Sequence, residues 1–94
     1  RLQSLTTTED TLRLEPLADK WKAFGWTCIE INGHDVKELN EAILVKSNKP
    51  KIIIANTIKG YGVSFMEDNV KWHYASPDEN QLFSALAEVE ERWK

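Results

Sequence analysis

Hydrophobic and polar positions follow two periods along the chain, one typical of helices and one typical of strands. The segment from Pro16 to Gly25 has the helical period, with proline at a tolerated first position and glycine as the stop. Its apolar stripe consists of Leu17, Ala18, Trp21 and Phe24. Residues 26–31, WTCIEI, are rich in aromatic and β-branched side chains and end at the turn Asn32-Gly33. The pattern predicts a short amphipathic helix followed by a strand.

A second helix and a second strand follow this turn. We expect Asp35 to cap the helix, with Glu38 at the capping-box position, and apolar residues repeat at helical spacing up to about Lys46. Residues 51–55, KIIIA, form a continuous β-branched run, which is typical of a parallel strand covered on both faces. Strand, helix and strand together predict a βαβ unit.

The last part of the chain has the signals of a third helix. Its start is expected at SPDE, with Ser76 as the cap, Pro77 at the first helical position and Glu79 at the capping-box position. The buried stripe of this helix is expected to consist of Leu82, Phe83, Leu86, Val89 and Trp93.

The number of strands bears on what the chain belongs to. Only two are convincing, with residues 2–5 as a third candidate, whereas a typical sheet has about five or six. A doubly covered strand needs neighbours that the chain does not supply, so we expect part of a larger α/β domain, or a partner that completes the sheet. The sequence begins without methionine, which indicates processing or a piece of a longer protein. The predicted class is α/β, a partial parallel sheet with a βαβ crossover and flanking helices.

Composition removes several classes of partner. The 94 residues, 41% of them hydrophobic, make one compact unit at most. A net charge of −3 without a basic stripe argues against nucleic acid, and no apolar run approaches the roughly 20 residues that cross a bilayer. A single cysteine, Cys28, cannot form an intramolecular disulfide, which favours a reducing compartment and a cytoplasmic location.

Residues 56–74 change character abruptly after the second strand. In open parallel sheets, ligands lie outside the carboxyl ends of the strands. Gly60 and Gly62 allow the backbone to approach a ligand or to take positive φ. Lys59 can neutralise an anion, and His73 can transfer a proton near neutral pH. On spacing alone, a plain turn and a structural histidine explain this stretch equally well.

Other candidate chemistry has less support. The neighbours of His34 in the turn NGHD explain that turn, so a structural role is favoured for this histidine. No cysteine, carboxylate or second histidine stands at metal-ligand spacing, and no base partners the serines as in a hydrolase triad.

Four blocks of the sequence resemble the closing part of the thiamine-diphosphate-binding domain of transketolases, most closely the N-terminal subunit of the split, two-subunit enzymes. The blocks are LEPLADKWKAFGW, IEINGHD, ANTIKGYGVSFMEDNVKWH and SPDENQLFSALAEVE. The resemblance covers nearly the whole chain and implies that residues 1–94 are the C-terminal portion of that domain. It implies an enzyme that transfers a two-carbon ketol unit from a ketose phosphate to an aldose phosphate with thiamine diphosphate and Mg²⁺ or another divalent cation.

The resemblance also implies partners. These are the missing N-terminal part of the same domain, a pyrimidine-binding domain or C-terminal transketolase subunit, and the sugar phosphates. The expected assembly is a homodimer or a heterotetramer.

Individual residues receive roles from the same resemblance. His73 matches a histidine at the cofactor diphosphate and the donor sugar, and is the predicted catalytic residue. Residues 58–60 (Ile58, Lys59 and Gly60) occupy the region against the cofactor, and Gln3 and Ser4 run along it. The main-chain carbonyl of Leu2 matches a metal ligand.

The sequence also departs from the family pattern. It has no GDG motif, and the metal-binding asparagine would fall just before Arg1, so one carbonyl alone cannot hold Mg²⁺ and the chain alone is expected to be inactive. Lys59 stands where single-chain transketolases more often have an apolar residue, and Tyr74 replaces a usual glycine, which could narrow the donor channel.

Two alternatives stay open. One is another thiamine enzyme such as 1-deoxyxylulose-5-phosphate synthase, against which the block DKWKAFGW argues. The other is a noncatalytic α/β scaffold that binds a partner through its open sheet edge.

Overall fold

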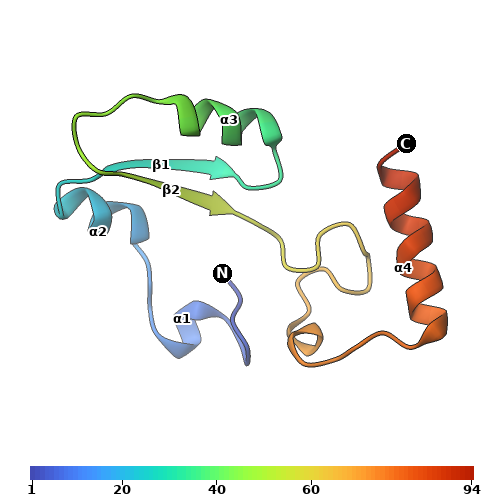
Figure 1. The fold of residues 1–94 in the computed structure, drawn as a ribbon. Coiled ribbons are helices and arrows are strands. Elements are labelled where there is room, and N and C mark those ends of the chain that lie inside the picture. Colours follow the sequence, from blue (N-terminus) through green and yellow to red (C-terminus); the bar gives the residue numbers. More distant parts are fainter. The chain divides into compact units, whose positions relative to one another are not determined.

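The computed structural model describes residues 1–94. The expectation of one compact unit at most is wrong, because the chain forms two. The first comprises Arg1 with Thr8–Thr57, and the second comprises Leu2–Thr7 with Ile58–Lys94. In chain order the elements are α1 (Thr8–Thr11), α2 (Leu17–Ala23), β1 (Thr27–Asn32), α3 (Val36–Leu44), β2 (Lys51–Asn56), the 3-10 helix η1 (Val70–His73) and α4 (Glu79–Arg92) (Figure 1). No helix is long and apolar enough to cross a bilayer.

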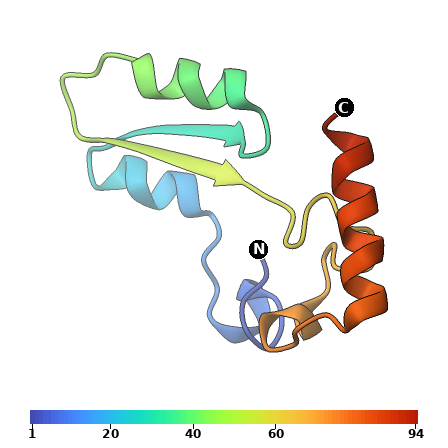
Figure 2. The same ribbon diagram turned by 45° about the vertical axis from the view of Figure 1, so that its right-hand side comes forward.

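The first unit contains a βαβ crossover. β1 and β2 pair in parallel, from Thr27 with Lys51 to Asn32 with Asn56, and α3 connects them. α3 lies on one face of the two strands and α2 lies on the other, which two views confirm (Figures 1 and 2). The predicted α/β class with a partial parallel sheet and flanking helices is therefore confirmed.

Local contacts explain why α3 begins where it does. The Asp35 carboxylate accepts hydrogen bonds from the N–H groups of Lys37 and Glu38, at 2.8 and 3.2 Å, as predicted for a cap. The Glu38 carboxylate does not close a capping box, because it accepts from the Asn32 N–H at 2.7 Å. This bond joins the start of α3 to the end of β1.

The C-terminus of α3 is satisfied by a lysine from the next strand. The Lys51 ammonium donates to the carbonyls of Ala42, Ile43 and Val45 at 2.8, 2.7 and 2.9 Å. These carbonyls would otherwise lack intrahelical partners, and a positive charge suits the negative end of the helix. The helix ends at Leu44, close to the predicted end.

Two predicted helix starts are wrong in detail. α2 begins at Leu17, so Pro16 takes the cap position and not the first helical position. α4 begins at Glu79 and its cap is Asp78, which accepts from the Gln81 N–H at 2.8 Å, while the Gln81 side chain accepts from the Asp78 N–H at 2.9 Å. This reciprocal capping box lies two residues after the predicted cap.

The residues that flank α2 show one confirmed signal and one perturbed carboxyl group. Gly25 has a φ of 84°, which confirms it as the stop of α2. The Leu17 N–H donates to the Glu15 carboxylate at 2.9 Å, and the Arg1 guanidinium contacts the same carboxylate. Both contacts stabilise the charged form and lower the pKa of Glu15.

At the N-terminus, the candidate third strand is wrong. Residues 2–5 form no strand, and Leu2 makes only an isolated antiparallel bridge with Thr7. The polar residues that follow contain the single helical turn α1.

The buried core is small. Its hydrophobic members are Ile31, Ala42 and Ile54 in the first unit and Val63 in the second. The predicted stripe of α2 is incomplete, because Phe24 is 78% exposed. The predicted buried stripe of α4 is wrong for this chain, since every member is exposed, including Trp93 at 73%. The more covered residues of α4 are Gln81, Ala85 and Glu88, on an adjacent face.

Candidate functional site

All of the predicted site residues lie in the second unit. They come from two segments that are far apart in the sequence, the N-terminal Leu2–Thr7 and the region after β2. The residues are Leu2, Gln3, Ser4, Ile58, Lys59, Gly60 and His73.

Residues 58–68, which we call the glycine loop, have a defined conformation. Gly60 and Gly62 have φ values of 72° and 99°, as predicted for positions that side chains resist. A Cβ atom on Gly60 would lie 2.5 Å from the carbonyl oxygen of Met66. The close backbone approach at Gly60 is therefore made within the loop itself. The Asp68 N–H donates to the Lys59 carbonyl at 3.0 Å and closes the loop.

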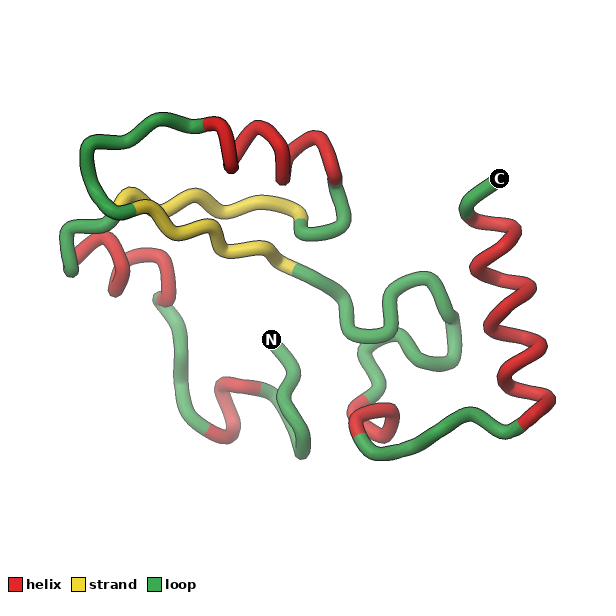
Figure 3. Tube along the Cα trace, in the orientation of Figure 1, coloured by secondary structure: helices red, strands yellow, loops and turns green.

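Lys59 and Ile58 stand at the start of the glycine loop. The Lys59 side chain is half-buried, and its main-chain carbonyl accepts the Asp68 N–H. Ile58 is 39% exposed. The loop is drawn in Figure 3 as the irregular stretch between β2 and η1.

His73 is the last residue of η1, directly after an anchored tryptophan. The Trp72 indole N–H donates to the Phe65 carbonyl at 2.9 Å, and the two rings lie 5.3 Å apart. Asn69 caps η1 by accepting from the Lys71 N–H at 3.1 Å. These contacts are made by Trp72 and Asn69, and the His73 side chain is exposed. An imidazole at this place is held in position by its backbone and stays open to a ligand.

Tyr74 contacts the ring of His73. The two ring centroids lie 4.5 Å apart with an interplanar angle of 88°. Tyr74 is 75% exposed. The tyrosine therefore limits the side from which a ligand can approach the imidazole.

The N-terminal segment directs the Leu2 peptide groups outward. The Gln3 N–H donates to the Thr6 carbonyl at 2.9 Å and the Thr8 N–H donates to the Arg1 carbonyl at 2.8 Å, on either side of the Leu2 and Thr7 pair. In this antiparallel arrangement the flanked residue points its own N–H and C=O away from the facing chain. The Leu2 carbonyl therefore points away from the facing Thr7 segment.

The other two N-terminal candidates contact each other. The Ser4 hydroxyl donates to the Gln3 side-chain oxygen at 2.7 Å.

No group of three or more histidine, cysteine, aspartate or glutamate residues is arranged to hold a metal ion. A divalent ion such as Mg²⁺ takes about six oxygen ligands. These side chains therefore do not form a complete site for such an ion.

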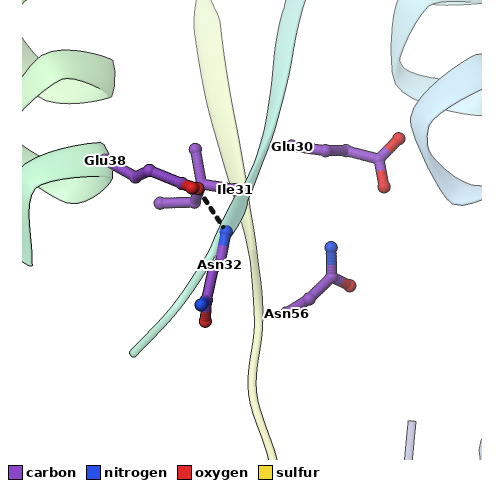
Figure 4. A pocket seen from close by; sticks show the side chains of 5 residues that line it. All are labelled: Glu30, Ile31, Asn32, Glu38 and Asn56. Carbon is purple, nitrogen blue, oxygen red and sulfur yellow. Dashed lines mark hydrogen bonds between the residues drawn. The ribbon is translucent and has the colours of Figure 1, made fainter. Parts of the chain in front are cut away.

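The surface hollows of the first unit lie elsewhere. One is lined by Glu30, Ile31, Asn32, Glu38 and Asn56 (Figure 4). Glu30 and Ile31 point to opposite sides of β1, and the Glu38 carboxylate reaches the Asn32 N–H. A second hollow lies between β1 and α3. No predicted site residue lines either hollow.

Sequence reasoning missed the α4 residues that contact the glycine loop, namely Glu88 and Arg92. Their only signal is a spacing of four on a helix, which places both on one face. That spacing is common on solvated helix faces and does not identify the residues that Glu88 and Arg92 contact.

Comparison with known proteins gives a consistent result. The family model described as transketolase, thiamine diphosphate binding domain, matches residues 4–89. The chain is 41% identical over 95 residues to an apulose-4-phosphate transketolase subunit of Phocaeicola vulgatus, covering 98% of this chain and 34% of the relative. It is 41% identical over 86 residues to 6-deoxy-6-sulfo-D-fructose transketolase subunit SqwG of Clostridium sp. (strain MSTE9), covering 88% of this chain and 31% of the relative.

A human protein is similar over a shorter stretch. The chain is 37% identical over 68 residues to the transketolase of Homo sapiens, covering 72% of this chain and 11% of the relative. The chain thus spans about a third of the length of the two bacterial relatives and a smaller share of the human one. Because the family model matches nearly the whole sequence, the chain belongs to the transketolase family, within its thiamine diphosphate-binding domain.

Proposed function

We propose that this chain is the C-terminal portion of the thiamine-diphosphate-binding domain of a transketolase. The enzyme transfers a two-carbon ketol unit from a ketose phosphate to an aldose phosphate. The observation that carries the proposal is that the two segments with candidate cofactor contacts, far apart in sequence, fold into one compact unit. The relatives reported above are named as transketolases, which favours this activity over 1-deoxyxylulose-5-phosphate synthase and over a noncatalytic scaffold.

The glycine loop would hold the diphosphate end of the cofactor. Lys59 brings a positive charge to the start of the loop, Ile58 an apolar surface, and Gly60 a backbone without a side chain. Gln3 and Ser4 would line the other side. When bound, thiamine diphosphate stabilises a carbanion, and the protein supplies binding and orientation.

His73 would hydrogen bond to the diphosphate and to the hydroxyls of the donor sugar, and would move a proton there. Its exposed ring on an anchored 3-10 turn is suited to both roles. Tyr74 beside it would limit the size of the donor.

The Leu2 carbonyl would supply one ligand to Mg²⁺ or another divalent cation. The remaining ligands would come from residues outside this chain, because Mg²⁺ demands near-octahedral oxygen ligation. The chain alone would therefore be inactive.

The partners follow from the same reasoning. Two of the relatives are named as subunits, so a separate C-terminal transketolase subunit or pyrimidine-binding domain would complete the active site, in a homodimer or heterotetramer. The single cysteine and the lack of a basic stripe agree with a cytoplasmic enzyme of sugar phosphates.

Isothermal titration calorimetry tests the binding part. The full-length protein, assembled with its C-terminal partner, is titrated with thiamine diphosphate in the presence of Mg²⁺, and saturable binding is expected. The assembly is then supplied with xylulose 5-phosphate and ribose 5-phosphate, or with pyruvate and glyceraldehyde 3-phosphate. Turnover of the second pair alone would reject transketolase, and an absence of binding heat from a folded assembly would reject both thiamine enzymes.

A further inference from the structure

The C-terminal helix contacts the glycine loop with charged side chains. Ser64 is held twice by Glu88, whose carboxylate oxygens accept from the Ser64 N–H at 2.6 Å and from its hydroxyl at 2.9 Å. Bonds from a neutral donor to an ionised acceptor are stronger than neutral pairs. Glu88 therefore fixes both the backbone and the side chain at one point of the loop.

Arg92 fixes a second point, one helical turn further along. Its guanidinium carbon lies 4.0 Å from the centre of the Tyr61 ring, and its Nη1 atom lies 3.7 Å from Glu67 Oε1. The same Glu67 oxygen accepts from the Gly62 N–H at 3.0 Å. Arg92 thus supports the carboxylate that orients the second glycine.

These contacts use one face of α4. Glu88 and Arg92 are four residues apart and so lie on the same side of the helix, which includes the partly covered Gln81 and Ala85. The exposed apolar stripe begins one residue later, about 100° around the helix axis. Loop contact and apolar stripe are therefore separate faces, and a change to the first need not alter the second.

When a loop is already ordered in the free protein, ligand binding has a smaller cost in conformational entropy. Fixing the backbone of a residue is unfavourable in entropy, and preorganisation raises affinity by removing that cost from the binding step. The held donors, the Ser64 and Gly62 N–H groups, lie just after Lys59 and Gly60, the residues proposed to meet the diphosphate.

We propose that Glu88 and Arg92 are positioning residues of the cofactor site. They hold the glycine loop in its binding conformation from the C-terminal helix, and they raise the affinity for thiamine diphosphate through the loop. The effect of Glu88 and Arg92 on thiamine diphosphate affinity rests on the proposed function. Their stabilisation of the glycine loop does not depend on it.

Hydrogen–deuterium exchange of the full-length protein tests the hold directly. The isosteric change Glu88→Gln removes the charge, and the exposed Glu90→Gln on the same helix is its matched control. Arg92→Gln is compared with Lys94→Gln in the same way. Faster exchange at the Ser64 amide is expected in Glu88→Gln and at the Gly62 amide in Arg92→Gln, with both controls like the wild type.

Titration with thiamine diphosphate and Mg²⁺ then tests the consequence. We expect the Kd of Glu88→Gln to rise about tenfold, the effect of losing roughly one charge-assisted hydrogen bond, with kcat at saturating cofactor within about twofold of the wild type. A double-mutant cycle of Glu88→Gln with Ser64→Ala should be non-additive, because both changes break one contact.

The outcomes separate the two proposals. Unchanged exchange at both amides would overturn the hold of α4 on the loop. Faster exchange with an unchanged Kd would overturn the positioning role. A wild-type assembly that binds no thiamine diphosphate would refute the proposed function, while the exchange rates would still decide whether α4 holds the loop.

Discussion

Gly60→Ala should lower the free energy of unfolding by more than the positive φ of residue 60 alone explains. Two costs add at this position. An alanine at a φ of 72° costs about 1–2 kcal/mol for the left-handed backbone. Its Cβ would also lie 2.5 Å from Met66 O and 2.6 Å from Met66 C, so the backbone must shift. Overpacking that shifts backbone costs about 1–3 kcal/mol more.

Two other glycines separate these costs. Gly25 has a φ of 84° with nothing within 4 Å of an added Cβ, and Gly62 has a φ of 99° with its nearest contact at 3.9 Å, to a flexible arginine. Both alanine variants are therefore expected to carry only the backbone cost. Urea unfolding of the full-length protein measures the free energy of unfolding of each variant. Titration with thiamine diphosphate measures how far each change weakens cofactor binding by the glycine loop.

The expected order is a loss of about 2–5 kcal/mol for Gly60→Ala and about 1–2 kcal/mol for Gly25→Ala and Gly62→Ala. Gly60→Ala should also weaken cofactor binding, and Gly25→Ala should not. A Gly60→Ala variant that is no less stable than Gly62→Ala would show that the Met66 backbone does not pack against residue 60. The reasoning about the loop would then be wrong.

Three further results are expected from single changes in the assembled protein. His73→Ala should lower kcat about 10²–10⁴-fold, a larger factor than its loss of affinity for thiamine diphosphate, whereas His34→Ala should leave kcat unaltered. Unchanged turnover of the His73 variant in steady-state assays would return this histidine to a structural role. Asp78→Ala should lower the free energy of unfolding, measured by thermal unfolding, by about 1 kcal/mol, and Ser76→Ala should leave it almost unchanged. The reverse order would show that Ser76 is the cap of α4. The lowered pKa of Glu15 means that its contribution to the stability of the fold is complete above the ordinary carboxyl pKa and is lost as the pH falls through the lowered pKa. An NMR titration that finds an ordinary pKa for Glu15 would contradict its contacts with Leu17 and Arg1.

Short-range signals in the sequence predicted most of the first unit. The stop at Gly25, the cap at Asp35 and the β-branched run at residues 51–55 each act over a few residues, and each is confirmed. The start of α4 shows the limit of such signals. Ser76 and Asp78 are both good caps with a suitable residue three positions later, and only the observed hydrogen bonds decide between them.

Contacts between distant segments could not be read in the same way. The Ser64 and Glu88 pair spans 24 residues, and neither residue carries a pattern that names the other. The helical spacing of the apolar residues in α4 is visible in the sequence, but such spacing does not identify what covers them, and they are exposed here. The roles of His73, Lys59 and the N-terminal residues came from the family resemblance and stay predictions.

In the proposed enzyme, the glycine loop and the N-terminal segment form one wall of the thiamine diphosphate site. The decisive measurement is hydrogen–deuterium exchange of the full-length assembly with and without saturating thiamine diphosphate and Mg²⁺. We expect slower exchange on cofactor addition both in Leu2–Thr7 and in residues 58–68. Protection that is absent from both segments, or that appears instead around the hollow at Glu30, Asn32 and Asn56, would contradict it.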